Sequence, residues 1–528
     1  MSPYAGLGRL LRLAWRRDRL LIVLSGLGLI VLAAGSAQAT FALYPDPAQA
    51  QGELAGVFDN PATVALYGPL ASHSLDALAN FKTLFMGAVL LALLAHAIVR
   101  RHTRAEEEDG RAELLGAGAV GRRAPLTAAM ALSAAAVLVI SSLAAISLIA
   151  VGCQATGSWA LAVGWVGLGL TFTALTGVAA QLASTSRGVA GLTLGTLAVT
   201  FLVRMVADTA PAPWLHWLSP FGWITEIAPF GANRFWVLAV ALAVSAALAA
   251  AAYRLQSERD LGAGILPARR GPATGSLHSV ADLVARTARP SVLGWLITMV
   301  VLGAVVGSLV GAVGQMVSDP KVAEMLEALA GGAGSIEDIF LRTELLFASA
   351  AVTAAALAVL GRLSAEERSG RSELLLSRPV PRLRWFLAHV ALAVGLAIGL
   401  LLILGMVIGA SSARSLGVSI ADQVPRLAGA ALAMSPAVLT VIGAGALLHG
   451  LSARWGTAAW AVLAVGFLLG EIGPTMNLPQ WLVNLSPFAH LSQLPGGALA
   501  GTSAVVLLAL GAAGVIAGGA AYVRRDLA

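Results

Sequence analysis

Long apolar stretches alternate with short polar segments along the whole chain. Twelve of these stretches approach or exceed the ~20 residues that an α-helix needs to cross a bilayer. They lie at 20–42, 82–99, 125–151, 158–183, 189–208 and 234–254 in the first half, and at 293–316, 345–361, 384–411, 427–450, 455–472 and 499–523 in the second. Charged residues make up only 12% of the chain, against about 25% in soluble domains. The pattern predicts an all-α polytopic membrane protein with twelve transmembrane helices in two tandem six-helix repeats.

Two short phrases occur once in each half and identify the repeat. The first, 105–115, returns as 365–375 with eight of its eleven residues identical. The second, 214–221, returns as 481–488, and both copies end in Ser-Pro-Phe. The same phrases in the same order indicate a tandem duplication. We therefore expect three parts: a first six-span half at 1–262, a cytoplasmic linker at 263–276 and a second six-span half at 277–528.

The positive charges indicate the orientation of the chain. If the N-terminus is cytoplasmic, most of the 34 Lys and Arg residues fall in inner segments, as the positive-inside rule requires. The exceptions, which fall outside or at outer membrane ends, are Lys82, Arg204, Arg234, Lys321, Arg342, Arg414 and Arg426. We therefore expect both termini in the cytoplasm. The net charge of +7 is then a consequence of topology, and no nucleic-acid partner is expected.

The first phrase lies in the inner loop between spans two and three of each half. In both copies a Thr or Ser precedes a Glu by three residues (Thr103 and Glu106; Ser364 and Glu367), which fits a helix-capping box. A short helix with an acidic start and an apolar edge is typical of a docking element. The alternative is a solvated run of charges that only enforces topology. Since topology requires Arg and not Glu, the glutamates favour docking.

The second phrase lies outside, between spans five and six. Prolines interrupt this segment repeatedly, and its Trp residues suit the membrane interface. The segment therefore fits either short re-entrant helices that close the outer end of a pathway or a simple aromatic belt. Its candidate residues are Trp214, Pro220 and Phe221 in the first half and Trp481, Pro487 and Phe488 in the second.

One set of charged residues lies within the spans, where charges are costly and usually paired. Alignment of the two second phrases places Arg204 opposite Glu471, at equivalent depths of spans five and eleven. One hypothesis is an ion pair between the halves near an outer gate. The other is a pair between Arg204 and Asp208, one helical turn further on.

Two further patterns concern structure. Rows of Gly at helical spacing, 303–311 and 395–399, are helix-packing signals. The long outer segments contain helical patterns at 72–81 and 321–329. The sequence assigns no ligand to either segment.

Together these features resemble the permease of ABC-2 type ABC transporters. A basic amphipathic helix precedes the first span, the inner loop reads Glu-x-x-x-Gly-x-x-Glu-Leu-Leu, and the outer segment contains Ser-Pro-Phe. Within this family the chain is similar to the double-length, tetronasin-type multidrug exporter permeases of actinobacteria. The linker sequence 258–267 is also similar to that group.

The resemblance implies a partner and a set of coupling residues. In the family the loop forms a coupling helix that sits in a cleft of a cytosolic ABC ATPase, expected here as a homodimer with two copies per permease chain. That partner binds ATP and Mg²⁺, so no cofactor, catalytic residue or metal ligand is expected in this chain. The coupling residues are expected to be Glu106, Glu107, Gly110, Arg111 and Glu113, with Glu366, Glu367, Gly370, Arg371 and Glu373. Because Glu108-Asp109 is replaced by Arg368-Ser369, the two docking sites should be unequal.

The sequence contains no phosphate-binding loop of its own. Such a loop needs Gly before Lys, but the two lysines, Lys82 and Lys321, follow Phe81 and Pro320. The resemblance therefore implies a non-enzymatic permease in a bacterial plasma membrane, surrounded by lipid. Its cargo is expected to be hydrophobic or amphipathic compounds, such as drugs or antibiotics, which it moves out of the cell.

A proton-coupled secondary transporter of the major facilitator type is the alternative. That family also has six plus six spans and a charged Gly-Arg loop, which Asp109-Gly110-Arg111 fits. Against it, the second copy has Ser369 in place of the Asp, and the spans hold few acidic residues for proton transfer. A membrane-embedded metalloenzyme has almost no support, because the histidines show no ligand spacing.

Overall fold

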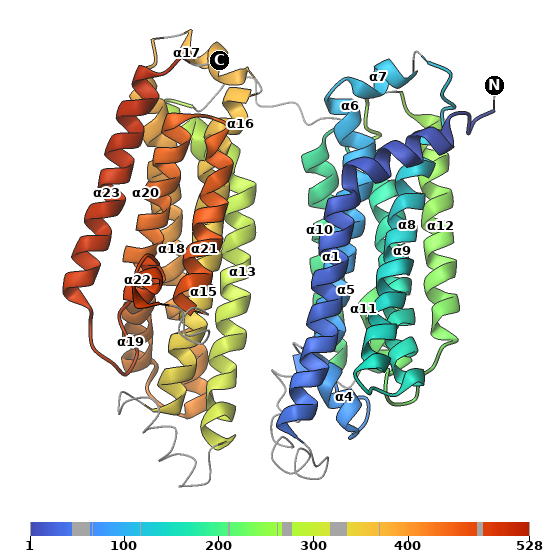
Figure 1. Cartoon of the computed structure of the whole chain (residues 1–528), viewed down its shortest axis with the longest axis horizontal. Helices are drawn as coiled ribbons and strands as arrows, with labels where there is room; N and C mark the ends of the chain where they lie inside the picture. The colour runs from blue at the N-terminus through green and yellow to red at the C-terminus, as the bar shows by residue number, and fades with distance from the viewer. Residues whose placement is uncertain are drawn as a thin grey trace. The chain divides into compact units, whose positions relative to one another are not determined.

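The computed structural model describes residues 2–44, 64–65, 67–116, 118–209, 212–260, 262–266, 277–316, 335–368, 370–377, 379–471 and 479–526. Within these ranges every regular element is a helix, and the chain divides into two compact units at Gly271 and Pro272, inside the predicted linker (Figure 1). Eleven helices of the described residues are long and apolar enough to cross a membrane. The remaining predicted span, 455–472, corresponds to a shorter apolar helix over Trp455–Gly470. The chain is an all-α polytopic membrane protein.

Unit 1 (Met1–Gly271) is a bundle around one central helix, α9. Its long helices are α1 (Leu7–Leu43), α5 (Thr83–Arg100), α8 (Ala124–Ala150), α9 (Ala155–Leu182), α10 (Ser186–Thr209) and α12 (Val237–Glu258). Helix α9 contacts α5, α8, α10 and α12. Gly87 of α5 leaves room for the buried ring of Trp165, whose Nε1 donates to the carbonyl oxygen of Leu84 at 2.7 Å. Small residues thus allow large rings to fill the core between the helices.

Unit 2 (Pro272–Ala528) repeats this arrangement. Its helices are α13 (Val280–Met316), α15 (Ile336–Leu360), α18 (Arg382–Leu416), α19 (Ile420–Leu432), α20 (Ser435–Leu451), α21 (Ala459–Glu471) and α23 (Gly501–Arg524). Helix α13 packs on α18 as α1 packs on α8, and α23 packs on α20 as α12 packs on α9. The two units therefore share helix order and pairing.

The first predicted glycine row packs against a helix of its own unit, and the second does not. A Cβ on Gly307 would lie 2.6 Å from the carbonyl oxygen of Ile408 on α18. Ser411 and Ser415 of α18 donate to carbonyl oxygens of the row, at 3.2 and 3.1 Å. In contrast, a Cβ on Gly395 or on Gly399 meets nothing within 4 Å in the described parts of the chain. This face of α18 therefore has no packing partner among the described residues of unit 2, and helix packing at the second row stays a prediction.

The outer segments are described only in part. The helical pattern at 72–81 forms α4 (Leu75–Asn80), and Ser74 caps it by accepting a hydrogen bond from the N–H of Ala77 at 3.2 Å. The second pattern, 321–329, lies outside the described residues.

Candidate functional site

The first duplicated phrase forms a helix–glycine–helix turn in both units. In unit 1 the second span continues through a π-helical turn (η1, Arg101–Ala105) into α6 (Glu106–Glu108), and α7 (Arg111–Gly116) follows. In unit 2 the same elements are α16 (Arg362–Arg368) and α17 (Arg371–Leu376). Gly110 and Gly370 both have a φ of 71°, a left-handed conformation that Gly adopts without strain. In each unit the glycine ends one helix and turns the chain into the next.

The capping boxes predicted for this phrase are wrong. Thr103 lies inside the helix, and its hydroxyl donates to the carbonyl oxygen of Val99 at 2.6 Å. Ser364 also lies inside a helix, where its hydroxyl bonds Nδ1 of His449 at 2.6 Å. A capping residue must be non-helical. Because the second span of each unit runs on through these positions, there is no helix start for them to cap.

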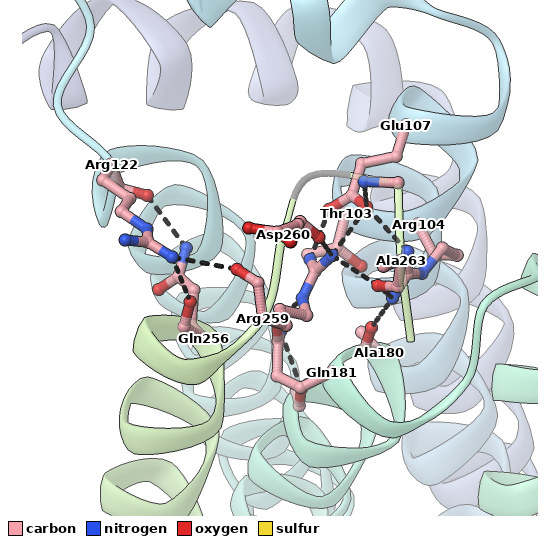
Figure 2. Close-up of polar contacts among 12 residues, drawn as sticks. Thr103, Arg104, Glu107, Arg122, Ala180, Gln181, Gln256, Arg259, Asp260 and Ala263 are labelled. Carbon is pink, nitrogen blue, oxygen red and sulfur yellow. Dashed lines mark hydrogen bonds and ion pairs between the residues drawn. The ribbon is translucent and has the colours of Figure 1, made fainter. Parts of the chain in front are cut away.

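Glu107 of the phrase is held inside unit 1 by two arginines. Nη1 of Arg104 lies 2.7 Å from its Oε2, and Nη2 of Arg259 lies 2.5 Å from its Oε1 (Figure 2). Arg259 follows the last helix of the unit and also donates from Nε to Gln181 at 2.6 Å. The carboxylate therefore joins the loop to the ends of α9 and α12.

Glu367 of unit 2 is held by one arginine, which also follows the last helix of its unit. Arg525, which follows α23, donates from Nη1 and Nη2 to the two carboxylate oxygens at 2.5 and 2.6 Å. The Glu367 side chain is only 2% exposed. We call the pairs Arg259–Glu107 and Arg525–Glu367 the arginine clamps. Since each clamp joins the phrase to the last helix of its own unit, it is a second feature that the duplication has kept.

A further arginine braces the last helix in both units. Nη2 of Arg122, before α8, donates to the carbonyl oxygens of Gln256 at 3.1 Å and Arg259 at 2.9 Å. In unit 2, Nη1 of Arg382 donates to the carbonyl oxygen of Arg525 at 3.0 Å. These contacts satisfy main-chain acceptors at the end of a helix. The sequence analysis did not identify these arginines. In both halves a clamp arginine follows the last span and a brace arginine lies at the start of the third span, and this shared position was the available signal.

The remaining residues of the phrase divide into inward and outward groups. Glu106 is buried and accepts from Arg17 and from Nε of Arg111, the latter at 2.8 Å. Its carboxylate raises the pKa of the Arg111 guanidinium, mainly through this hydrogen bond. Glu113 is exposed, and the neighbouring Leu114 is 77% exposed. An acidic and an apolar side chain thus face outward together on α7.

Unit 2 presents the corresponding surface with different neighbours. Glu366 lies 3.0 Å from Arg371, as Glu106 pairs with Arg111, and Glu373 is exposed. The first helix differs: Arg17 of α1 reaches Glu106, whereas unit 2 has Thr287 at the corresponding place. The two loops therefore share their turn and clamp but differ in their surroundings.

At the opposite end of unit 1, Arg204 pairs with Asp208. Its Nη1 lies 3.0 Å from Oδ2 of Asp208, and both side chains are fully buried. Nη2 donates to the carbonyl oxygen of Ala65 at 2.8 Å, and the guanidinium lies 4.0 Å from the ring centre of Phe85. This pair within α10 is the second of the two hypotheses that the sequence left open for Arg204. The side chain of Glu471 lies outside the described residues, so its pairing with Arg204 stays a prediction.

The Ser-Pro-Phe segments form short helices that are anchored into each bundle. In unit 1 these are η2 (Pro213–Leu218) and α11 (Pro220–Ile227), and in unit 2 they are α22 (Gln480–Val483) and η4 (Pro487–His490). Ser219 donates to the carbonyl oxygen of Thr200, and Ser486 to that of Gly466, both at 2.6 Å.

The aromatic residues of these segments separate into two groups. Phe221 and Phe488 are buried, whereas Trp214 is 63% and Trp481 68% exposed. Phe221 lies 6.4 Å from the ring of Phe85, beside the Arg204 site. Both sequence interpretations therefore have support: short helices pack inward through Phe, and Trp faces the surroundings. A gating role stays a prediction.

No group of three or more potential metal ligands occurs among the described residues. Each unit instead has two distinct sites: the exposed loop lies at one end of the helix bundle, and the Ser-Pro-Phe segment lies at the other.

Comparison with known proteins agrees with the duplication. The family model for the multidrug efflux system permease Rv1217c, C-terminal domain, matches residues 7–254 and 277–523. The chain is 35% identical over 530 residues to the multidrug efflux system permease protein Rv1217c of Mycobacterium tuberculosis, covering 100% of this chain and 96% of that protein. The chain belongs to the Rv1217c family of multidrug efflux permeases.

Proposed function

We propose that this protein is the transmembrane permease of an ATP-driven multidrug exporter, and that a separate cytosolic ATPase docks on the exposed faces of α7 and α17. Family membership supports drug efflux. Coupling to an ATPase is supported mainly by the repeated turn. The second helix of each turn presents an exposed glutamate, Glu113 in unit 1 and Glu373 in unit 2. Two such sites suit a dimer of ATPase subunits, with ATP and Mg²⁺ bound by the dimer.

The arginine clamps supply a path for the movement. A force on α7 acts through α6 on Glu107, and through Arg259 on the end of α12. Charge-assisted, bidentate hydrogen bonds of this kind are the strongest that side chains form. Because the same connection runs from α17 to α23 through Arg525, closure of the ATPase dimer moves the last helix of each unit.

The position of the site in the membrane follows from charge. Arg residues concentrate at the end that carries the loop, so the positive-inside rule supports our proposal that this end faces the cytoplasm. We propose that the membrane is a bacterial plasma membrane. Family membership supports a drug as the cargo, and we propose that it is a hydrophobic or amphipathic drug or antibiotic.

Co-purification tests docking directly. The permease is expressed with its candidate ATPase, and a tag on the permease captures both. We expect Glu113→Arg with Glu373→Arg to abolish capture of the ATPase, because both acidic contacts become repulsive. The control is Glu258→Arg, an exposed carboxylate at the same end of unit 1. Equal capture by wild type and the double variant would contradict docking at α7 and α17.

A further inference from the structure

A cavity of about 440 Å³ lies at the loop end of unit 1. Its apolar wall comes from the start of α1 and the start of α8, including Leu10, Leu13 and Leu126. Its polar wall includes Arg17, Arg122 and the clamp residues. A cavity of this size that joins an apolar wall to a polar one suits one amphipathic, drug-sized ligand.

Three carboxylates line this cavity, and two of them, Glu106 and Glu107, are held by arginines at both oxygens; the third is Asp260. Glu106 accepts from Arg17 at Oε1 and from Arg111 at Oε2. Glu107 accepts from Arg259 at Oε1 and from Arg104 at Oε2. The three arginines of the lining (Arg17, Arg122 and Arg259) are matched by three carboxylates, so binding of an anion depends on the unused donors of Arg122 and not on an excess of positive charge.

Arg122 provides the free donors. Its Nη2 donates to main-chain carbonyl oxygens at the end of α12 (Figure 2). Its Nε and Nη1 form no hydrogen bond with any residue that the structure describes, which leaves three N–H donors. Arg17 uses only Nη1, on Glu106. An arginine with unused, parallel donors is suited to a carboxylate, sulfonate or phosphate group.

Gln256 also lines the cavity. Oε1 of Gln256 is buried and has no hydrogen-bond partner among the described residues, while its amide nitrogen donates to the carbonyl oxygen of Arg122 at 2.8 Å (Figure 2). Buried polar atoms without a partner are costly. Because this oxygen is closed off from the open space of the cavity, it does not contribute a contact to the site.

We propose that this cavity binds a compact amphipathic anion. Its apolar body packs on Leu13 and Leu126, and its anionic group accepts hydrogen bonds from Arg122. The cavity volume favours a small solute over a two-chain phospholipid, although both can carry the same anionic chemistry. Binding concerns the permease chain alone and does not depend on coupling to an ATPase.

Two fluorescent probes that differ in one group test the proposal. Anilinonaphthalenesulfonate carries an aromatic body, an N–H and a sulfonate, and phenylnaphthylamine lacks only the sulfonate. Each is titrated into the full chain in an uncharged detergent, with the signal of the detergent alone subtracted. We expect the sulfonate to bind at least about tenfold more tightly, which is one step of 1.4 kcal/mol. Equal affinities would overturn the proposal.

Matched variants locate the site. Arg122→Gln removes the anion contact and one brace, and Arg382→Gln removes the equivalent brace of unit 2. We expect only Arg122→Gln to weaken sulfonate binding, about tenfold or more. If that variant does not fold, Leu13→Asp tests the same site, because it places a negative charge on a side chain that is 47% exposed. Equal weakening by Arg382→Gln, or no effect of Leu13→Asp, would overturn the assignment.

Native mass spectrometry separates the two sources of anion. We expect the purified wild-type chain to take up the sulfonate probe whether or not phosphatidylglycerol is present. If phosphatidylglycerol instead stays bound through Arg122 and excludes the probe, the occupant is a lipid and the proposal of a compact solute is wrong.

Discussion

Arg525 holds Glu367 through two parallel hydrogen bonds of 2.5 and 2.6 Å. Arg525 lies at the end of the chain, 158 residues beyond its partner, so the bond ties the end of α23 to the loop after α15. Unit 1 contains the same tie between Arg259 and Glu107. One long-range ion pair has thus been kept in both halves of the duplication, although much of the sequence has diverged, which argues that the connection is required.

Loss of one clamp partner should destabilise the protein. Arg525→Met leaves the buried Glu367 carboxylate without its cation, which costs about 3–5 kcal/mol in comparable buried pairs. We expect a lower midpoint of thermal unfolding. The double variant Arg525→Met with Glu367→Leu should recover part of the loss, since no unpaired charge remains. A double variant no more stable than the single one would contradict this explanation.

Substitution of the turn glycines should disrupt ATPase capture. Valine at positions 110 and 370 would have to adopt a φ near 71°, which costs L-residues roughly 1–2 kcal/mol each and is worst for β-branched side chains. We expect Gly110→Val with Gly370→Val to reorient α7 and α17 and to reduce capture. Gly191→Val is the control, because that glycine is helical and a Cβ there meets nothing within 4 Å. Unchanged capture by the double variant would show that the turn does not orient the docking helices.

The two glycine rows should respond in opposite ways to a larger side chain. Gly307→Leu forces atoms into the backbone of α18, whereas Gly395→Leu meets no described neighbour. Overpacking costs typically about 1–3 kcal/mol. We expect a large drop in the unfolding temperature for Gly307→Leu and little change for Gly395→Leu. If both variants unfold at the same temperature, α13 and α18 do not pack as described.

The single cysteine should be unreactive in the folded protein. Cys153 is buried, and burial raises the pKa of its thiol to about 11. The reactive thiolate is therefore scarce at neutral pH. We expect slow maleimide labelling at neutral pH, faster labelling as the pH rises towards the folded-state pKa, and complete labelling after denaturation. Rapid labelling of the folded chain at neutral pH would place Cys153 on the surface.

The sequence was sufficient for the spans and the duplication, because these depend on local hydrophobicity and on repeated residues. It did not separate the exposed Glu113 and Glu373 from the buried Glu106 and Glu367. It could not predict the arginine clamps. Arg259 lies 152 residues from Glu107, and nothing local distinguishes it from other arginines beside a span. The contact exists only because α12 ends next to the loop after α5.

The capping-box prediction failed for a related reason. The spacing from Thr103 to Glu106 is correct for a cap, but a cap also requires a helix to start there. Apolar length alone placed the end of span two near residue 99, whereas the helix runs on through η1 and α6. Buried ion pairs such as Glu107 with Arg104 and Arg259 make that extension favourable, and they depend on tertiary contacts.

Drug transport into inside-out membrane vesicles tests the central claim most directly. Vesicles that contain the permease and its candidate ATPase are given a fluorescent drug, and uptake is measured with ATP and with an imposed proton gradient. We predict uptake that requires ATP, persists when a protonophore collapses the gradient, and disappears in Glu113→Arg with Glu373→Arg. Uptake driven by the gradient without ATP or ATPase would contradict the account and identify a proton-coupled carrier.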